Sequence, residues 1–314
     1  MKKTMSLILA VVLALGIFAG IPYSENAFDF LKIEAKAASE GYLTFTLNDD
    51  GQSYSVTECD RYASGEIVIP STYNGLPVTV LGLDSFYSAP HIEKITIPAS
   101  VTSIETYFFY CPVLEEINVD SNNPNYSSEK GILFNKDKTE LLMYPDGKYD
   151  ESYTVPNSVT TIATAAFSGN QFITTIIIPD SVTSVGYDLF YDCVSLVSVT
   201  IGSGVTSLNG SPFTGCESLA EINIDENNTA FSSVDGVLFN KNKTELIIYP
   251  AKKTDASYVV PGSVTTICDS AFFNNANLTS VEIGENVTSI GDGAFAGCSA
   301  LTTLTIPDSV TYLG

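Results

Sequence analysis

The stretch VTSIGDGAFAGCSALTTLTIPDSVT, residues 287–311, ends on nearly the same residues with which it begins. Its opening valine recurs at intervals of 23 residues, interrupted by one interval of 58 and one of 59. A fixed period of about 20–50 residues is typical of a solenoid, in which short units stack along one axis. The sequence therefore predicts one repeat array rather than the two globular domains that its length would otherwise suggest. The marker valines are Val78, Val101, Val159, Val182, Val205, Val264, Val287 and Val310.

Each unit follows the pattern L-x-x-I-x-I-P-x-S-V-T-x-I-x-x-x-A-F-x-x-C. The run TTLTIP alternates apolar and polar residues, which predicts a strand with one buried face, and its proline ends the strand by removing a backbone donor. SVTSI is a second short extended piece, and the phenylalanine after it, as in Phe190 and Phe295, is predicted to fill the interior. Stacked units should share one continuous core. The predicted strands are residues 95–97, 117–119, 176–178, 199–201, 222–224, 281–283 and 304–306.

Four of the six cysteines occupy one repeated position, three residues before a leucine, which we call the slot. Because the slot also holds Ala89, Asn170 and Asn275, we interpret it as a small interior position where a thiol packs or an asparagine bonds loop backbone. We expect free thiols, although a bridge between Cys193 and Cys216 is geometrically conceivable. No cysteine or histidine spacing indicates a metal site. The slot cysteines are Cys111, Cys193, Cys216 and Cys298; Cys59 and Cys268 lie outside it.

The repeated signature IGxxAFxxCxxL resembles the BspA-like, or Treponema pallidum-type, leucine-rich repeat, from about Gly65 to Gly314. The resemblance implies a mainly β fold: a right-handed leucine-rich-repeat solenoid with a parallel sheet on its concave face. It also implies a secreted or surface protein used for adhesion and protein binding. No catalytic residues belong to the repeat in that family.

Two longer units explain the two long intervals. Residues 120–158 and 225–263 align without a gap and are identical at 23 of 39 positions. Within them, ILFNKDKTELLMYP and VLFNKNKTELIIYP predict hairpins with turns at residues 136–139 and 241–244. Each long unit should end in a strand, at residues 153–155 and 258–260. Two interpretations remain open: the hairpin packs on the solenoid through Leu133, Phe134 and Tyr144, or it forms a recognition ridge.

The N-terminal region divides into two predicted parts that precede the array of residues 66–314. Residues 1–37 are interpreted as a signal peptide, because Lys2 and Lys3 precede an apolar run and small residues follow it; the alternative is an anchor that stays attached. Residues 38–65 are predicted to form a β-hairpin cap with a turn at Asp50 and Gly51. A calcium site at these acids is the weaker alternative, because the ligand spacing of an EF-hand is missing.

Charge and motif content exclude several classes of function. A formal net charge of −22 repels phosphate backbones and anionic lipids, so we expect neither a nucleic-acid partner nor membrane insertion after signal removal. His91, the sole histidine, lies in a repeat corner without a catalytic partner, and acidic pairs such as Glu115 and Glu116 carry no specificity. We therefore predict no enzymatic activity, no cofactor, and no catalytic or metal-binding residues.

The outward side chains of the predicted strands form the candidate binding face. This face is short, polar and mildly acidic and lacks an aromatic platform for sugars, which favours a protein partner with a basic surface over a glycan. A merely solvated sheet, whose threonines reflect β-propensity, is the alternative for any single residue. The candidate residues are Glu116, Asn118, Ser198, Thr200, Glu221, Asn223 and Glu282.

Two classes of function fit these observations. The first is a secreted or cell-surface protein that mediates protein binding or adhesion. The second is the substrate-targeting repeat region of a larger secreted enzyme. After Pro307 the chain starts another unit with DSVTYLG and stops at Gly314, before the phenylalanine turn. We therefore expect further repeats, another domain or a surface attachment beyond residue 314.

Overall fold

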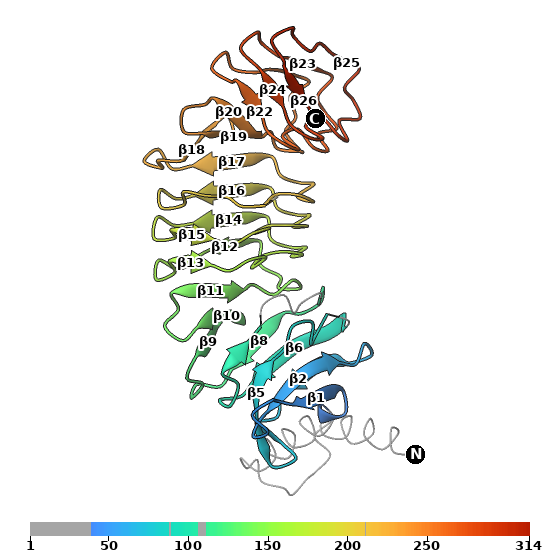
Figure 1. Cartoon of the computed structure of the whole chain (residues 1–314), viewed down its shortest axis with the longest axis vertical. Helices are drawn as coiled ribbons and strands as arrows, with labels where there is room; N and C mark the ends of the chain where they lie inside the picture. Colours follow the sequence, from blue (N-terminus) through green and yellow to red (C-terminus); the bar gives the residue numbers. More distant parts are fainter. Residues whose placement is uncertain (1–38, 88, 106–110, 211) are drawn as a thin grey trace, which may run out of the picture.

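The computed structural model describes residues 39–87, 89–105, 111–210 and 212–314. The predicted signal peptide lies outside these residues. The described chain coils into a long array of short strands, with the N-terminal hairpin at one end and β26 at the other (Figure 1). The array has two strand-bearing faces, one built from the TTLTIP-type strands, which we call the front face, and one from the SVTSI-type strands, which we call the back face.

The front face consists of three separate parallel sheets. All seven predicted strands are present in whole or in part, and the pairing follows the repeat register, with Ile176 opposite Val199 and Val199 opposite Ile222. The handedness and the concavity of the face stay predictions. The three sheets are β3 (Ser64–Val68), β6 (His91–Ile97) and β8 (Glu116–Val119); β12 (Ser152–Thr154), β14 (Thr175–Ile178), β16 (Ser198–Ile201) and β17 (Glu221–Ile224); and β21 (Ser257–Val259), β23 (Ser280–Glu282) and β25 (Thr303–Leu304).

The back face also consists of three sheets, each of which begins with antiparallel strands and continues in parallel register. They are β1 (Leu43–Leu47), β2 (Tyr54–Cys59), β5 (Leu76–Leu81) and β7 (Ser103–Ile104), with β4 (Thr72–Tyr73) beside β5; β9 (Tyr126–Glu129), β10 (Ile132–Asn135), β11 (Glu140–Met143), β13 (Thr161–Ile162) and β15 (Ser184–Val185); and β18 (Phe231–Val234), β19 (Val237–Asn240), β20 (Glu245–Ile248), β22 (Thr266–Ile267), β24 (Ser289–Ile290) and β26 (Tyr312–Leu313).

The predicted N-terminal hairpin is confirmed. Strands β1 and β2 pair antiparallel, and β2 pairs in parallel with β5, so the hairpin extends the back face at that end of the array. The turn forms at the predicted residues because Gly51 has a φ of 64° and the Asp50 carboxylate accepts the backbone N–H of Gln52 at 2.7 Å. Asp50 therefore organises the turn as a local hydrogen-bond acceptor.

Both long units contain the predicted hairpin, β10–β11 and β19–β20, and one more strand that the sequence analysis missed. Strand β9 pairs antiparallel with β10, and β18 with β19, so each long unit is a three-stranded meander. The extra turn has positive φ at both central residues, 52° and 80° at Lys130 and Gly131, as in a tight two-residue hairpin. The equivalent Asp-Gly pair, at Asp235 and Gly236, is a strong hairpin signal in the sequence.

The meander explains why the front face is not the single sheet that the sequence predicted. The backbone N–H of Ile117 on β8 donates to the carbonyl oxygen of Gly131 at 2.9 Å, and that of Val119 donates to the Ser128 hydroxyl at 3.0 Å. Ile222 and Gly236 repeat the first contact at 2.9 Å. Because the meander takes these donors, the sheet ends at β8 and again at β17.

The interior is likewise divided into three clusters, which corrects the expected continuous core. Successive side chains of a strand point to opposite faces. Leu133 on β10 packs into the first cluster, whereas its neighbours Ile132 and Phe134 pack into the second. Leu238 on β19 packs into the second cluster, with Val237 and Phe239 in the third. Strands β10 and β19 are therefore buried walls between clusters, and this supports the packing interpretation of Leu133 and Phe134.

Aromatic rings of successive units contact one another inside the coil, some stacked and some tilted. Phe190 is fully buried between Phe167, with ring centroids 5.6 Å apart, and Phe213, at 5.5 Å. Tyr144 takes the ring position in the first long unit and lies 5.3 Å from Phe167. The predicted burial of Phe295 is only partly correct. It is half-buried because, among the described residues, Phe272 alone stacks on it.

All six cysteines are free, as predicted. Slot thiols donate to the carbonyl oxygen of the preceding unit's phenylalanine, from Cys193 to Phe167 at 3.0 Å and from Cys216 to Phe190 at 3.1 Å. Asparagine occupies the slot after each long unit, where its amide donates to two carbonyl oxygens of that long unit. The Asn170 amide donates to the carbonyl oxygens of Pro145 at 2.9 Å and of Lys148 at 3.3 Å. The residue type in the slot therefore depends on the turn of the preceding unit that supplies its carbonyl acceptors.

We predict that Phe190→Ala lowers the free energy of unfolding by about 3–5 kcal/mol, because it removes a buried ring and leaves a cavity between two others. Tyr191→Ala is the matched control, since Tyr191 is the next residue in the chain and is 41% exposed. Urea unfolding followed by circular dichroism measures both changes. Equal losses from the two variants would contradict the stacked interior.

We also predict that thiol reagents label the folded protein slowly and label all six cysteines after denaturation. Burial raises the pKa of Cys216 to about 12 and that of Cys268 to about 11, so little reactive thiolate forms at neutral pH. Mass spectrometry after alkylation, with and without urea, measures the number of labelled thiols. Rapid labelling of Cys193 or Cys216 in the native protein would show that the slot is open to solvent.

Candidate binding face

The structure places the seven candidate residues on the outward side of the front face, distributed over its three sheets. Alternation sets this orientation, because Val199 and Ile222, their neighbours on β16 and β17, are fully buried. Strand β8 carries Glu116 and Asn118. Strands β16 and β17 carry Ser198, Thr200, Glu221 and Asn223, and β23 carries Glu282.

Four of the candidates form one contiguous group on the middle sheet. Ser198 lies opposite Glu221 and Thr200 lies opposite Asn223, and the Ser198 hydroxyl donates to the Glu221 carboxylate at 2.9 Å. Ile177 on β14 is the next residue in the Thr200 row and is 40% exposed, although the sequence analysis did not select it. Ile177 could have been recognised in the sequence, because it is an apolar residue at an outward strand position where the neighbouring strands carry a polar one. The group therefore combines polar atoms, one carboxylate and an apolar contact, and we call it the middle patch.

The other three candidates lie apart from the middle patch. Glu116 forms an ion pair with Lys94 on β6 at 3.0 Å, and both side chains are 41% exposed. Lys94 holds the pKa of Glu116 below its usual range. A basic partner would have to compete with Lys94 for the Glu116 carboxylate. The first sheet therefore presents less negative charge than its sequence suggests. Glu282 on the third sheet lies beside Val259, whose side chain is 62% exposed.

No catalytic arrangement accompanies these residues in the described part of the chain. His91 is exposed at the start of β6, and no group of three metal-ligating side chains occurs among the described residues. One buried acid stands out. Burial raises the pKa of Asp146 to about 7, against the lowering effect of the Cys111 N–H that it accepts at 3.3 Å. A shifted carboxyl can mark an active site, but the Cys111 thiol beside it already donates to backbone oxygens. We therefore interpret Asp146 as structural.

A second exposed feature lies at the turns. Tyr149 is 75% exposed and its ring lies 5.1 Å from that of Phe172, at a tilt of 57°; Phe172 is 36% exposed. The second long unit has Thr254 where the first has Tyr149, so the aromatic pair is particular to the first long unit. The sequence analysis missed the pair because it considered only strand positions. Among the described residues, no helix is long and apolar enough to cross a membrane.

A family model agrees with the repeat geometry. The model described as BspA type leucine rich repeat region matches six copies, over residues 55–140, 147–259 and 252–314. The matched segments cover well over half of the chain. No curated protein sequence matches the chain.

Solved structures show the same fold. A leucine-rich repeat protein from Eubacterium ventriosum is 28% identical with a TM-score of 0.58, and the match covers 79% of this chain and 62% of that protein. A leucine-rich cell-surface protein from Faecalibacterium prausnitzii is 22% identical with a TM-score of 0.59, over 87% of this chain and 83% of that one. The pneumococcal vaccine antigen PcpA is 22% identical with a TM-score of 0.52, over 86% and 69% of the two chains.

The raised pKa of Asp146 predicts how stability depends on pH. The pKa of about 7 lies above the ordinary value of 3.8 for an aspartic acid, so the folded state binds the proton more tightly than the unfolded state. The stability that the neutral acid provides is present at low pH and is lost as the pH rises through about 7. Asp146→Asn, a neutral mimic of the protonated acid, should therefore stabilise the protein at about pH 8 more than at about pH 5. Urea unfolding at the two pH values measures this.

Asp137→Asn is the matched control, because it makes the same change in net charge on an exposed turn. An equal response of the two variants at both pH values would refute the assignment to Asp146.

Proposed function

The chain belongs to the BspA-type leucine-rich repeat family, and on this basis we propose that it is a secreted or cell-surface protein that binds a protein partner through its front face, without catalysing a reaction. Two structural relatives, the cell-surface protein of Faecalibacterium prausnitzii and the pneumococcal antigen, support the location. The chain spans 62% of the Eubacterium ventriosum protein, so the proposal concerns the repeat array.

The observation that carries the proposal is the middle patch. Its outward side chains lie opposite one another on paired strands of a four-stranded sheet. The last strand of that sheet carries the exposed carboxylate of Glu221. Short side chains on paired strands lose little conformational entropy when a partner covers them. Asp225 and Glu226 directly follow β17 and add two carboxylates beyond its other end.

The partner that fits this surface is a protein with a basic patch. The chain carries a net charge of −22, which accelerates association with a cationic surface and repels an anionic one. Glu221 offers its charge more freely than Glu116, because a serine hydroxyl binds it rather than a lysine. We therefore expect the middle patch to contribute more to binding than the outward residues of β8.

We predict that Glu221→Gln combined with Asn223→Ala weakens binding by about five-fold or more, which corresponds to about 1 kcal/mol. Immobilised wild-type protein is used to capture one partner from surface extracts, and the Kd of that purified partner is then measured for each variant. Raising the salt concentration should weaken the wild-type interaction.

Two controls accompany this measurement. Glu116→Gln with Asn118→Ala should have a smaller effect, and Glu245→Gln on the exposed back face should have none. Unfolding curves should show similar stability for all variants. Binding that is unchanged by the Glu221 and Asn223 substitutions, or insensitive to salt, would overturn the assignment of the middle patch to a basic partner.

A further inference from the structure

A cleft of about 780 Å³ lies where the N-terminal hairpin meets the first unit of the array. We call it the cap cleft, and it is lined by residues 41–44, 58, 60–62, 87, 90 and 91. The loop of residues 60–62 reaches the array because β3, which follows it, pairs with β6 and places Ser64 opposite His91. The volume lies within the range of about 300–1,000 Å³ that is typical of ligand sites.

Three tyrosine rings line the cap cleft, and all three are exposed. Tyr42 is 36% exposed before β1, Tyr62 is 73% exposed in the loop, and Tyr87 is 60% exposed in the first turn of the array. The ring contacts between described residues do not pair these three tyrosines with one another. Their faces are therefore open to a ligand. Single exposed rings are common on protein surfaces, but a group of them around one cleft indicates a contact site.

Backbone hydrogen bonds hold the loop that carries Tyr62. The N–H of Asp60 donates to the carbonyl oxygen of Tyr42 at 2.7 Å, and the N–H of Ala63 donates to that of Asp60 at 2.8 Å. The Asp60 carboxylate accepts the N–H of Tyr62 at 2.8 Å. Because the loop is already ordered, a ligand loses little affinity to ordering it.

The only arginine and the only histidine of the chain line the same cleft. The guanidinium carbon of Arg61 lies 5.4 Å from the centroid of the Tyr62 ring, so cation–π attraction positions it while its N–H donors stay available. Tyr62 keeps its large exposed area with Arg61 in this place. Glu58 on β2 adds a carboxylate acceptor. The cap cleft therefore offers hydrogen-bond donors and acceptors beside its rings.

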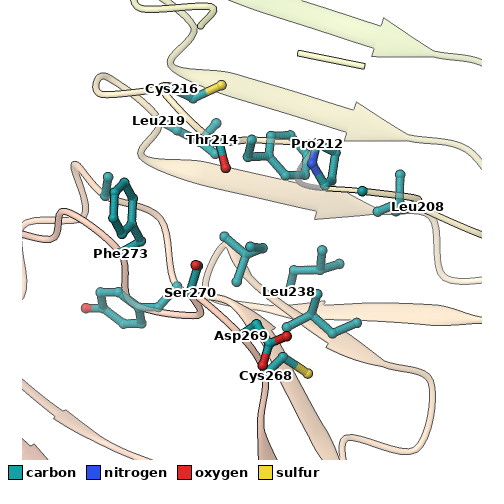
Figure 2. Close-up of a pocket in the computed structure, with 16 residues that line it drawn as sticks. Leu208, Pro212, Thr214, Cys216, Leu219, Leu238, Cys268, Asp269, Ser270 and Phe273 are labelled. Carbon is teal, nitrogen blue, oxygen red and sulfur yellow. The ribbon is translucent and has the colours of Figure 1, made fainter. Parts of the chain in front are cut away.

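A second cavity, of about 290 Å³, differs in its lining. It lies between the turn that carries Pro212 and Thr214 and the turn that carries Ser270 (Figure 2). The rings of Phe213 and Tyr249 in its lining are buried in the second and third core clusters. None of its lining residues is a lysine, arginine or histidine. Of these two cavities, the cap cleft is the one that presents exposed rings together with charged donors.

A neutral saccharide matches this combination of groups. The faces of a pyranose ring carry C–H groups, which are weakly positive and pack on the negative face of a tyrosine ring. Its hydroxyl groups can donate to carboxylates and accept from a guanidinium or an imidazole. Charges of both signs line the cleft, so an anion would meet Glu58 and Asp60, and a cation would meet Arg61. The net charge of −22 also repels anionic ligands.

We propose that the cap cleft binds a neutral oligosaccharide. Pyranose faces lie on Tyr87 and on the face of Tyr62 that Arg61 leaves open, and hydroxyl groups bind Arg61 and Glu58. Three separate rings require more than one sugar, because one pyranose cannot cover them all. The cap cleft lies at the N-terminal end of the array, apart from the middle patch on β16 and β17. The proposal therefore stands independently of a basic protein partner.

Isothermal titration calorimetry with five neutral hexasaccharides tests the proposal. The probes are cellohexaose, xylohexaose, mannohexaose, maltohexaose and N-acetylchitohexaose, which differ in linkage and in the orientation of their hydroxyl groups. We expect at least one of them to bind with a Kd below about 1 mM. The anionic hexagalacturonate and the cationic chitosan hexamer should bind at least about five-fold more weakly than the best neutral probe.

Four variants assign the binding to the cap cleft. Tyr62→Ala and Tyr87→Ala should each weaken the best probe by about five-fold or more. Arg61→Lys should weaken it as well, because lysine keeps the charge but lacks the planar fork of donors. Tyr149→Ala is the matched control, since Tyr149 is as exposed as Tyr62 and lies outside the cleft, and it should change nothing. Unfolding curves verify that all four variants fold.

Three results would overturn the proposal. One is the absence of binding for all five neutral probes up to about 1 mM. The second is tighter binding of either charged hexamer, which would show that the cleft selects for charge. The third is an equal loss of affinity in the Tyr149→Ala and Tyr62→Ala variants, which would place the binding outside the cap cleft.

Discussion

Each turn of this coil completes its hydrogen bonds on the turn before it, and the rest of the structure depends on that constraint. Slot thiols and amides bond to carbonyl oxygens one unit back, as Cys193 does with Phe167 and Asn170 with Pro145. Buried polar groups must be paired, so the length of a unit cannot vary freely. The long units are tolerated because they keep a ring at the phenylalanine position, Tyr144 or Tyr249, and an asparagine in the next slot.

The sequence predicted the repeating elements well because each is specified locally. Alternation identified the front strands, proline marked their ends, and the exchange of Cys, Asn and Ala identified the slot as interior. The division of the sheet and the core could not be found in this way. It depends on which backbone donors the meander takes from β8 and β17, and on Leu133 and Ile132 facing different clusters. Only Asp235 and Gly236 gave a direct signal for the missed strand.

The candidate face illustrates the same limit. Alternation correctly placed all seven residues outward, since that follows from strand geometry alone. It could not show that Lys94 neutralises Glu116, or that Glu116 and Glu221 belong to different sheets. Those relations link residues that are one unit or several units apart. A property of one strand is predictable from its sequence, whereas a surface built by several strands requires their arrangement.

The walls formed by β10 and β19 also have a consequence for how the molecule loses its structure. In a solenoid with one uninterrupted core, each unit contacts only the units beside it. Local unfolding can therefore spread from unit to unit and stop at any point along the array. Here the boundaries are set, because each wall strand seals the cluster on either side with its own side chains. Heat, force or proteolysis should therefore remove whole blocks of units, with hydrogen exchange falling into three cooperative groups rather than a gradient from the ends. A chain built in this way can lose one block and keep the surface of another intact.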